Sequence, residues 1–267
     1  MRGKSVVALI AAVILSTAGA LQASKCGDYA PWSVGDKRDY SLVGTSITSV
    51  GEGEASESTT TLLKGSVSSE VVSIRERRRN GDVVYLSRTV LKISADEPGG
   101  DSSETTAETL TLASKRGYFV LATRDTETGK PEWHEYDPPL LDLPADLSPG
   151  RKWKVGTTQQ GTRRFDLLGQ VVSRESVETL AGKFPDCPKV LLTYTKTTGT
   201  ISLKHGGEIP IKSGQGTTTF WYAKGVGIVR EENLVQMKLE ASGDGEVQKV
   251  TLTQKMVEEL LPGYKVK

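Results

Sequence analysis

The chain has 267 residues, with 34 Lys and Arg against 33 Asp and Glu, 36% hydrophobic residues, two Cys and two His. It is too apolar and too evenly charged for a disordered protein, and long enough to bury a core in one large or two modest domains. A net charge of +1 gives no electrostatic reason to expect nucleic acid as a partner. So few His and Cys residues leave little material for a metal cage or a nucleophile–base pair, so the sequence predicts no metal, no cofactor and no catalytic group.

The N-terminus has the pattern of an export signal. A basic start precedes an uncharged apolar run from Val6 to Leu15, and Ala18-Gly19-Ala20 fits the small-residue rule for cleavage. The apolar core of about ten residues is shorter than the roughly 20 that a membrane-spanning helix needs, which disfavours a retained anchor. We therefore expect residues 1–20 to be removed, no transmembrane segment to remain, and the mature protein to be periplasmic or secreted.

Cys26 follows this leader closely, whereas Cys187 lies in the second half of the chain. Lys25 stands directly before Cys26, where a bacterial lipoprotein has a small residue, so lipidation is disfavoured. In an oxidising compartment a disulfide between Cys26 and Cys187 is possible, although the sequence cannot place their Cα atoms within reach. Two unpaired thiols are the alternative.

The first half of the chain reads as short strands and glycine turns. Asn80-Gly81 separates Val71–Arg79 from Asp82–Ile93 and predicts a hairpin, because both turn residues tolerate the positive φ of a type I′ turn. The small, acidic segment Ala95–Ala107 predicts a flexible loop, and a strand with a tight turn at Lys115-Arg116-Gly117 follows.

The second half continues the same pattern after a connector. Asp137–Gly150 carries four prolines and is expected to lack ladder hydrogen bonds. Only Gln254–Leu261 has helical spacing, which predicts a short C-terminal helix. The remaining expected elements are strands at Val190–Tyr194, Thr217–Tyr222 and Leu234–Leu239, with turns at Lys224-Gly225 and Ser242–Gly245.

The two halves resemble each other at two places. The segment around Gly35 is echoed around Gly150, and the strand–turn–strand segment around Lys115 is echoed around Lys224 at a similar offset. A duplicated β unit explains this likeness, and chance similarity between hairpins is the alternative. The sequence therefore predicts an all-β fold, a strongly curved antiparallel sheet or half-barrel. Its units are a β unit at 29–137, a connector at 138–150 and a second β unit at 151–267.

The C-terminal half carries a distinctive motif, WYAKGVGIVRE at Trp221–Glu231, preceded by Leu147–Trp153 and Ala181–Phe184. In this order the segments resemble a recurrent domain of exported bacterial proteins that is sometimes labelled TapB-like. The resemblance implies a secreted, strongly curved antiparallel sheet and implies no established reaction.

Two polar clusters could carry chemistry, and each has a simpler explanation. His134 shares a strand face with Glu132 and Tyr136, but a metal needs more ligands and only the distant His205 offers another imidazole. Clustered arginines at Arg75–Arg79 could recognise phosphate or a lipid head group. A hairpin tip is also where soluble sheets ordinarily place charges, which we take as the main interpretation.

The sequence favours a non-enzymatic envelope protein whose curved sheet binds an apolar or amphipathic molecule, such as a lipid. Trp153, Trp221 and Tyr222 are the expected ligand-lining residues. A structural or adaptor module that binds another envelope protein is the first alternative. A hydrolase centred on His134 or His205 is the second, and it would need an imidazole beside a carboxylate in a cleft.

Overall fold

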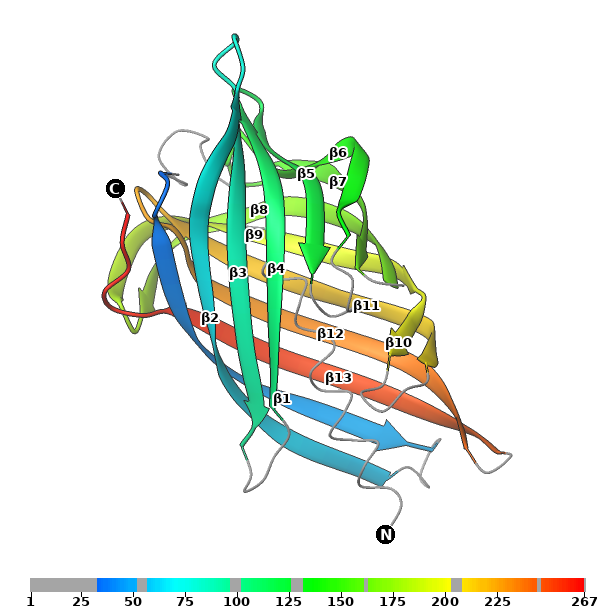
Figure 1. The fold of residues 1–267 in the computed structure, drawn as a ribbon. Coiled ribbons are helices and arrows are strands. Elements are labelled where there is room, and N and C mark those ends of the chain that lie inside the picture. Colours follow the sequence, from blue (N-terminus) through cyan, green and yellow to red (C-terminus); the bar gives the residue numbers. More distant parts are fainter. Residues whose placement is uncertain are drawn as a thin grey trace.

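The computed structural model describes residues 33–51, 57–96, 102–125, 132–160, 163–202, 208–243 and 246–266. The expected leader at 1–20, Cys26 and His205 lie outside these ranges. The described residues form strands and no helix (Figure 1). Within these ranges there is accordingly no helix with the length and apolarity to cross a membrane.

The strands are β1 (Lys37–Val50), β2 (Glu57–Arg77), β3 (Val83–Ala95), β4 (Ser102–Ser114), β5 (Gly117–Asp125), β6 (His134–Pro144), β7 (Lys152–Gln160), β8 (Arg163–Thr179), β9 (Gly182–Thr198), β10 (Thr200–Ser202), β11 (Glu208–Ala223), β12 (Gly227–Gly243) and β13 (Glu246–Leu260).

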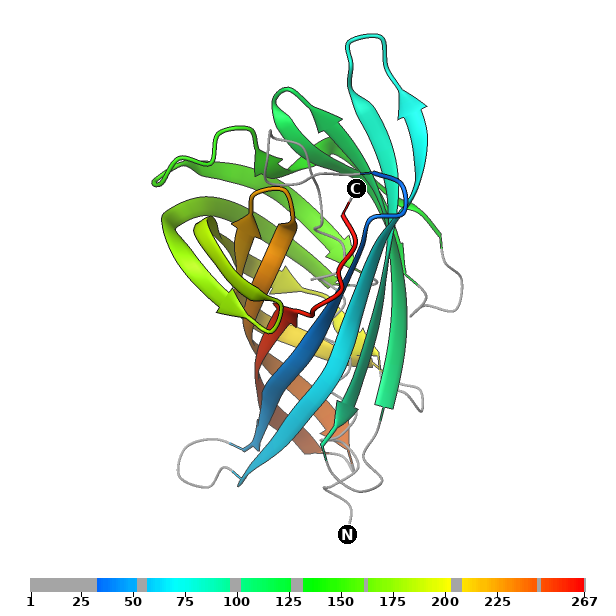
Figure 2. The same ribbon diagram turned by 90° about the vertical axis from the view of Figure 1, so that its left-hand side faces the viewer.

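One antiparallel sheet contains all of these strands. Its order is β6-β5-β4-β3-β2-β1-β13-β12-β11-β9-β8-β7, with the short β10 beside β11. The two halves are joined by the first and last strands, which pair from Tyr40↔Leu260 to Val50↔Val250. The sheet curls until its two ends, β6 and β7, approach each other (Figure 2). The predicted all-β, strongly curved antiparallel sheet is confirmed, and the curvature nearly closes it into a barrel.

Side chains join β6 to β7 where the hydrogen-bonded ladder ends. Trp153 Nε1 donates to the carbonyl of Leu141 at 3.0 Å, and the hydroxyl oxygens of Tyr136 and Thr158 lie 3.0 Å apart. Gly156 makes room for this approach, because a Cβ there would lie 2.5 Å from Leu140 Cδ2. Two side-chain hydrogen bonds and the close approach at Gly156 thus join β6 to β7, and we call this junction the seam.

The two halves begin with the same turn. Gly35 donates its amide to the carbonyl of Val71 at 2.8 Å, and Gly150 donates to Val171 at 2.8 Å. Both glycines have a positive φ, 87° and 89°, which a side chain would disfavour. A β-bulge directly follows Val71 on β2, and another directly follows Val171 on β8. The likeness seen in the sequence around Gly35 and Gly150 thus extends to their hydrogen bonds, while the duplication itself and the unit boundaries stay predictions.

The C-terminal helix is a wrong prediction. Gln254–Leu260 belongs to β13, which pairs with β1 on one side and β12 on the other. Met256 and Leu260 fit a helical stripe, but they fit an alternating strand equally well. Two neighbouring strands supply every backbone partner here, so tertiary pairing decides between the two periods.

Three smaller expectations also need correction. Ser102–Ala107, expected in a flexible loop, forms the start of β4 against β3. Leu140–Pro144, expected in an unpaired connector, pairs with β5 around a bulge that accommodates the prolines. Asn80 has no positive φ, so the hairpin at Gly81 is a longer turn, closed between Arg78 and Asp82, and not type I′.

Candidate functional site

Inward-facing polar side chains interrupt the apolar interior. On β12 the buried residues alternate, and Glu231 and Asn233 stand in phase with the apolar Val235, Met237 and Leu239. On β13 Glu258 stands in phase with Met256 and Leu260 in the same way. Because side chains alternate across a strand, these polar groups point into the core.

We define the interior polar cluster as Arg38 and Tyr40 of β1, Asp142 of β6, Tyr222 of β11, Glu231 and Asn233 of β12, and Glu258 of β13, all of them buried. Tyr40 lies within electrostatic reach of Glu231 and Glu258. Tyr222 lies within electrostatic reach of Asp142 and Glu231. Strands distant in the sequence therefore bring their ionisable groups to one region of the core.

Glu231 and Glu258 face each other directly across the β12–β13 ladder. Burial raises the pKa of both carboxyl groups, and the neighbouring Glu258 raises that of Glu231 further. Two such groups in direct apposition do not both ionise readily, because like charges in a dry interior repel. Around neutral pH the pair therefore retains a proton and offers both a hydrogen-bond donor and acceptors.

Asp142 is a third buried carboxyl group. It lies on β6 between Leu141 and Leu143, at a shift in the register with β5. Burial raises its pKa to about 7, well above the ordinary value for aspartate. Burial also raises the pKa of the nearby Tyr222, and Asp142 raises it further, so the phenol stays neutral.

Two members of the cluster form hydrogen bonds to backbone carbonyl groups. Arg38 Nε donates to the carbonyl of Val226 at 2.6 Å, and the Tyr40 hydroxyl donates to the carbonyl of Ile228 at 3.1 Å. The first bond fastens β1 to the turn between β11 and β12, and the second fastens it to the start of β12. The arginine is thus engaged with backbone, and the three carboxyl groups have no ion pair with a described residue.

Several polar atoms of the interior lack a hydrogen-bond partner among the described residues. They include Asp142 Oδ2, Glu231 Oε1, both side-chain polar atoms of Asn233, and the Ser46 hydroxyl. Leaving such an atom buried and unpaired costs about 1–3 kcal/mol. Native proteins nearly always satisfy buried polar groups with protein, water or ligand. The interior polar cluster therefore has capacity to bind hydrogen-bonding groups from outside the chain.

Apolar side chains surround these acceptors. Along the hydrogen-bonded row of the sheet, Leu42 lies opposite Glu258 on one side, and Phe220 lies opposite Glu231 on the other. Both are buried. A molecule in contact with this region would meet hydrocarbon and carboxyl oxygens side by side.

The three predicted ligand-lining residues do not share one surface. Tyr222 belongs to the interior polar cluster. Trp221 lies on the other face of β11, where its Nε1 donates to Glu175 Oε1 at 2.7 Å and the cations of Lys189 and Arg230 lie 4.9 and 5.5 Å from its ring centroid. Trp153 lies at the seam, its ring against Gly169. The motif of aromatic residues is thus divided between the two faces of the sheet.

The other singled-out residues stay apart from the interior polar cluster. His134 is exposed, its ring 4.8 Å edge-on from Tyr136, and it has no hydrogen bond to a described carboxylate. Cys187 is buried, its Sγ donates to the Phe184 carbonyl at 3.5 Å, and burial raises its thiol pKa to about 11. Its disulfide with Cys26 stays a prediction. Among the described residues, no group of three or more His, Cys, Asp and Glu is placed to hold a metal ion.

Sequence reasoning missed Asp142, Glu231, Asn233 and Glu258. A signal was present for the residues of β12 and β13, because a charged or amide residue in phase with the apolar positions of a strand is predicted to point inward. Asp142 had no such signal, because the prolines around it do not indicate a strand and β6 is irregular at this point.

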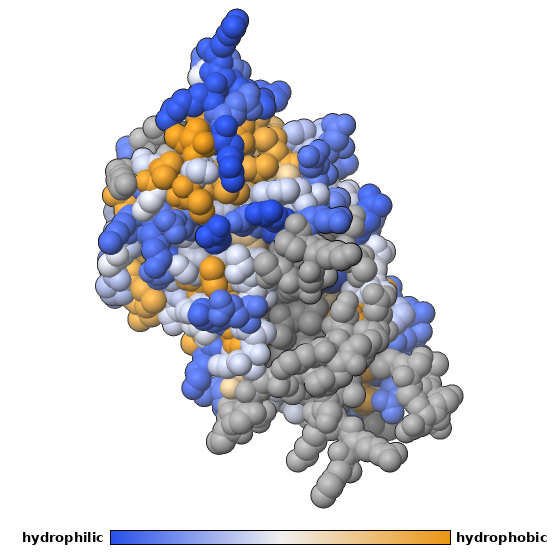
Figure 3. All heavy atoms as spheres, in the orientation of Figure 1, coloured by the Kyte–Doolittle hydropathy of each residue, from blue (hydrophilic) through white to orange (hydrophobic). Residues whose placement is uncertain are grey.

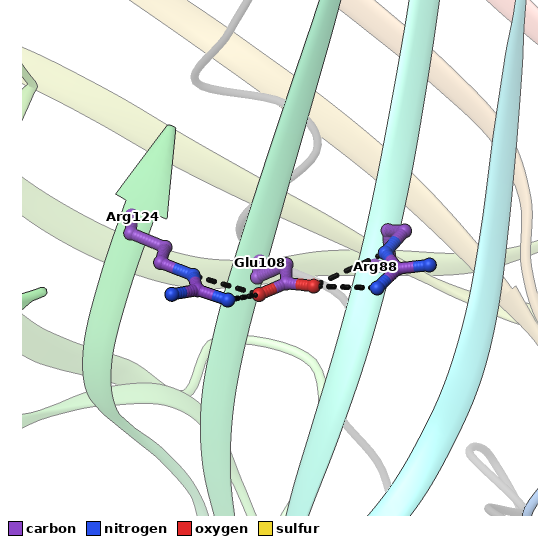
Figure 4. A network of polar contacts seen from close by, with 3 residues as sticks. All are labelled: Arg88, Glu108 and Arg124. Atoms are coloured by element: carbon purple, nitrogen blue, oxygen red, sulfur yellow. Dashed lines mark hydrogen bonds and ion pairs between the residues drawn. The ribbon is translucent and has the colours of Figure 1, made fainter. Parts of the chain in front are cut away.

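A fourth buried carboxyl group, that of Glu108 on β4, lies on the outer face of the sheet. Arg88 of β3 donates to its Oε1 through Nε at 3.1 Å and Nη2 at 2.9 Å, and Arg124 of β5 donates to its Oε2 through Nε at 2.7 Å (Figure 4). The ring of Trp133 lies 4.7 Å from the Arg124 guanidinium carbon. This network is fully paired and joins three strands.

The sequence matches no family model and no curated protein. Among solved structures it is similar to a candidate exported protein with a YmcC-like fold from Bacteroides fragilis, at 14% identity and a TM-score of 0.34 over 85% of this chain and 97% of that one. It is also similar to a candidate lipoprotein from Parabacteroides distasonis, at 16% identity and a TM-score of 0.34 over 86% of this chain and 98% of that one. A third similar structure is an outer membrane channel from Pseudomonas putida, at 12% identity and a TM-score of 0.30 over 90% of this chain and 100% of that one. At such TM-scores these similarities carry no conclusion about what the chain does.

Proposed function

We propose that the protein is an exported, non-enzymatic binding protein that holds a small amphipathic molecule against the inner face of its curved sheet. The apolar part of the molecule contacts side chains such as Leu42 and Phe220. Its polar part donates hydrogen bonds to Asp142 and Glu231 and pairs with the amide of Asn233.

One observation carries this proposal. The interior polar cluster places acceptors of Asp142, Glu231 and Asn233 deep inside the core, where they have no partner among the described residues. Apolar residues of similar volume would avoid the desolvation cost of these atoms, so their presence favours a hydrogen-bonding partner from outside the chain. An amphipathic ligand satisfies the acceptors and the apolar wall together.

The chemistry of the cluster also selects the ligand's head group. Three carboxyl groups and no uncommitted cation favour an amine or a hydroxyl, which donate hydrogen bonds, over a carboxylate, which would face like charge. The apolar N-terminal leader and the resemblance to TapB-like domains support an envelope location for this binding.

Thermal unfolding of the purified protein with three matched amphiphiles tests the proposal. Dodecanol and dodecylamine, below their micelle concentrations, are expected to raise the melting temperature, and dodecanoate is expected to raise it less. Glu231→Leu should abolish the rise without unfolding the protein, since it removes a buried unpaired polar group. Gln236→Leu, on the exposed face of the same strand, is the matched control.

Two outcomes of this experiment would contradict the proposal. If no amphiphile changes the melting temperature, or if Gln236→Leu and Glu231→Leu respond alike, the unpartnered atoms bind water only. Mass spectrometry of an organic extract of the purified protein provides an independent check, since a carried lipid should appear in wild type and be depleted in Glu231→Leu.

A second candidate function, an adaptor role, has one observation in its favour. Val43, Leu62 and Leu234 are 56%, 56% and 47% exposed on the outer faces of β1, β2 and β12. β1 and β2 are neighbours and β13 separates β1 from β12, and apolar residues exposed on nearby strands can form a contact surface for another protein. A defined partner that is retained by wild type and lost with Val43→Lys would support this role.

A further inference from the structure

The hairpin between β2 and β3 projects beyond the rest of the sheet. β1 accompanies β2 only as far as the pair Lys37↔Glu70, whereas β2 continues to Arg77. The tip stands clear of the neighbouring elements at the top of the molecule in both views (Figures 1 and 2). Residues at this tip are therefore placed to touch a surface or a ligand that the body of the sheet does not reach.

The tip carries cations without counterions. Arg75, Arg77 and Arg79 are exposed and make no ion pair with a described residue. Arg78 is paired with Glu76, Nε to Oε1 at 3.2 Å, and Asp82 accepts from Asn80 Nδ2 at 2.9 Å. The space-filling view shows the same tip as a hydrophilic projection (Figure 3). Three guanidinium groups, two at the end of β2 and one in the turn, thus have no carboxylate partner among the described residues.

The corresponding hairpin of the second half, between β8 and β9, differs. There Arg174 donates to both carboxylate oxygens of Asp186 at 2.7 Å, and Lys189 lies 3.3 Å from Glu175. Charges of either sign protect a hairpin from edge-to-edge pairing. Edge protection accounts for charged residues at both hairpins, but the first hairpin differs in that three of its cations have no counterion among the described residues.

We propose that the β2–β3 tip binds phosphate groups through Arg75, Arg77 and Arg79. The planar guanidinium fork matches two phosphate oxygens, and several forks at one end of a hairpin give such a site affinity that isolated surface cations lack. The phosphate can come from an anionic lipid head group or from a soluble phosphate, and the interior polar cluster has no part in this site.

Co-sedimentation with vesicles tests the site. The full chain is mixed with vesicles of phosphatidylcholine alone or with added phosphatidylglycerol. Binding to the anionic vesicles is expected, and Arg75→Gln/Arg77→Gln/Arg79→Gln should weaken it on the order of a hundredfold. The matched control, Lys152→Gln/Lys238→Gln/Lys255→Gln, removes the same charge from exposed positions elsewhere and should weaken it much less.

Inorganic phosphate distinguishes the two sources. Calorimetric titration with sodium phosphate against sodium chloride at equal ionic strength should show phosphate binding that the arginine variant lacks if the source is soluble. Binding to vesicles alone assigns the site to lipid head groups. Equal loss in both triple variants, or no preference for either phosphate source, would overturn the proposal. Circular dichroism establishes that both variants keep the strand content of wild type.

Discussion

Two buried carboxylate sites in this sheet have opposite electrostatics. Glu108 on the outer face receives hydrogen bonds from Arg88 and Arg124. Burial raises the pKa of Glu108, but the two guanidinium groups together outweigh burial and hold it below its usual value. Glu231 and Glu258 have no such cation, and burial raises the pKa of both.

The difference shows that burial alone does not assign a role to a carboxylate. A carboxylate that ties two arginines of neighbouring strands is already satisfied and stabilises the sheet. A carboxyl group that is buried without a partner costs stability, which is consistent with a role in binding. The two sites can therefore be separated by how stability responds to pH and to substitution.

The largest effect is expected at Asp142, which belongs to the unpaired site. Its folded pKa is raised to about 7, so between roughly pH 4 and 7 the folded state binds more protons than the unfolded state. Stability should then fall as pH rises through this window, by about 4 kcal/mol from this group. Urea denaturation across the window should show the fall in wild type and a flatter profile in Asp142→Asn. An unchanged slope in the variant would contradict the assignment.

Glu108→Ala should have the next largest effect, about 2 kcal/mol of lost stability at neutral pH, because it leaves Arg88 and Arg124 without their shared counterion. The folded pKa of Glu108 is lowered. Its contribution is thus present above the unfolded pKa and disappears as pH falls through the folded value. Denaturation of wild type and Glu108→Ala in acid and at neutral pH measures this, and the difference in stability between them should shrink in acid.

Trp221→Phe tests another carboxylate on the outer face, that of Glu175. The change keeps an aromatic ring but removes the Nε1 donor that lies 2.7 Å from Glu175 Oε1. A loss of about 1–2 kcal/mol is expected, since the bond has a charged acceptor. The Glu175→Gln/Trp221→Phe double variant should lose less than the sum of the single losses, and simple additivity would show that the bond contributes nothing.

The smallest effect is expected at Glu104, which shares β4 and its outer face with Glu108. Its carboxylate lies 3.0 Å from Lys92 Nζ, but both side chains are more than half exposed, at 57% and 61%. Exposed pairs of this kind contribute about 0–1 kcal/mol. Chemical denaturation of Glu104→Ala should differ from wild type by less than Glu108→Ala does, which makes Glu104→Ala the control for that variant.

Local pattern predicted the strands where a period of two had no rival. Thr217–Tyr222 and Leu234–Leu239 lie in β11 and β12, and Lys224-Gly225 is the turn between them. The helix expected at Gln254–Leu261 was wrong because Met256 and Leu260 satisfy both the helical and the strand period. Ser102–Ala107 failed because small polar residues, typical of loops, also form a strand when β3 supplies the backbone partners.

The candidate site was less predictable than the fold. The aromatic residues Trp153 and Trp221 attracted attention by their rarity, yet each is engaged, one with the Leu141 carbonyl and the other with Glu175. Glu231 and Glu258 stand in phase with the apolar positions of their strands, a pattern that indicates only that they point inward. They become a pair only because β12 lies beside β13 in one particular register.

The sequence by itself determined the strand class, the positions of the glycine turns and the way side chains alternate between the two faces, because these depend on neighbours along the chain. Tertiary structure alone decided which strands became partners, how far the sheet curled and which carboxyl groups met a cation. Those outcomes depend on distances between residues far apart in sequence, and electrostatic energy and desolvation are set by those distances.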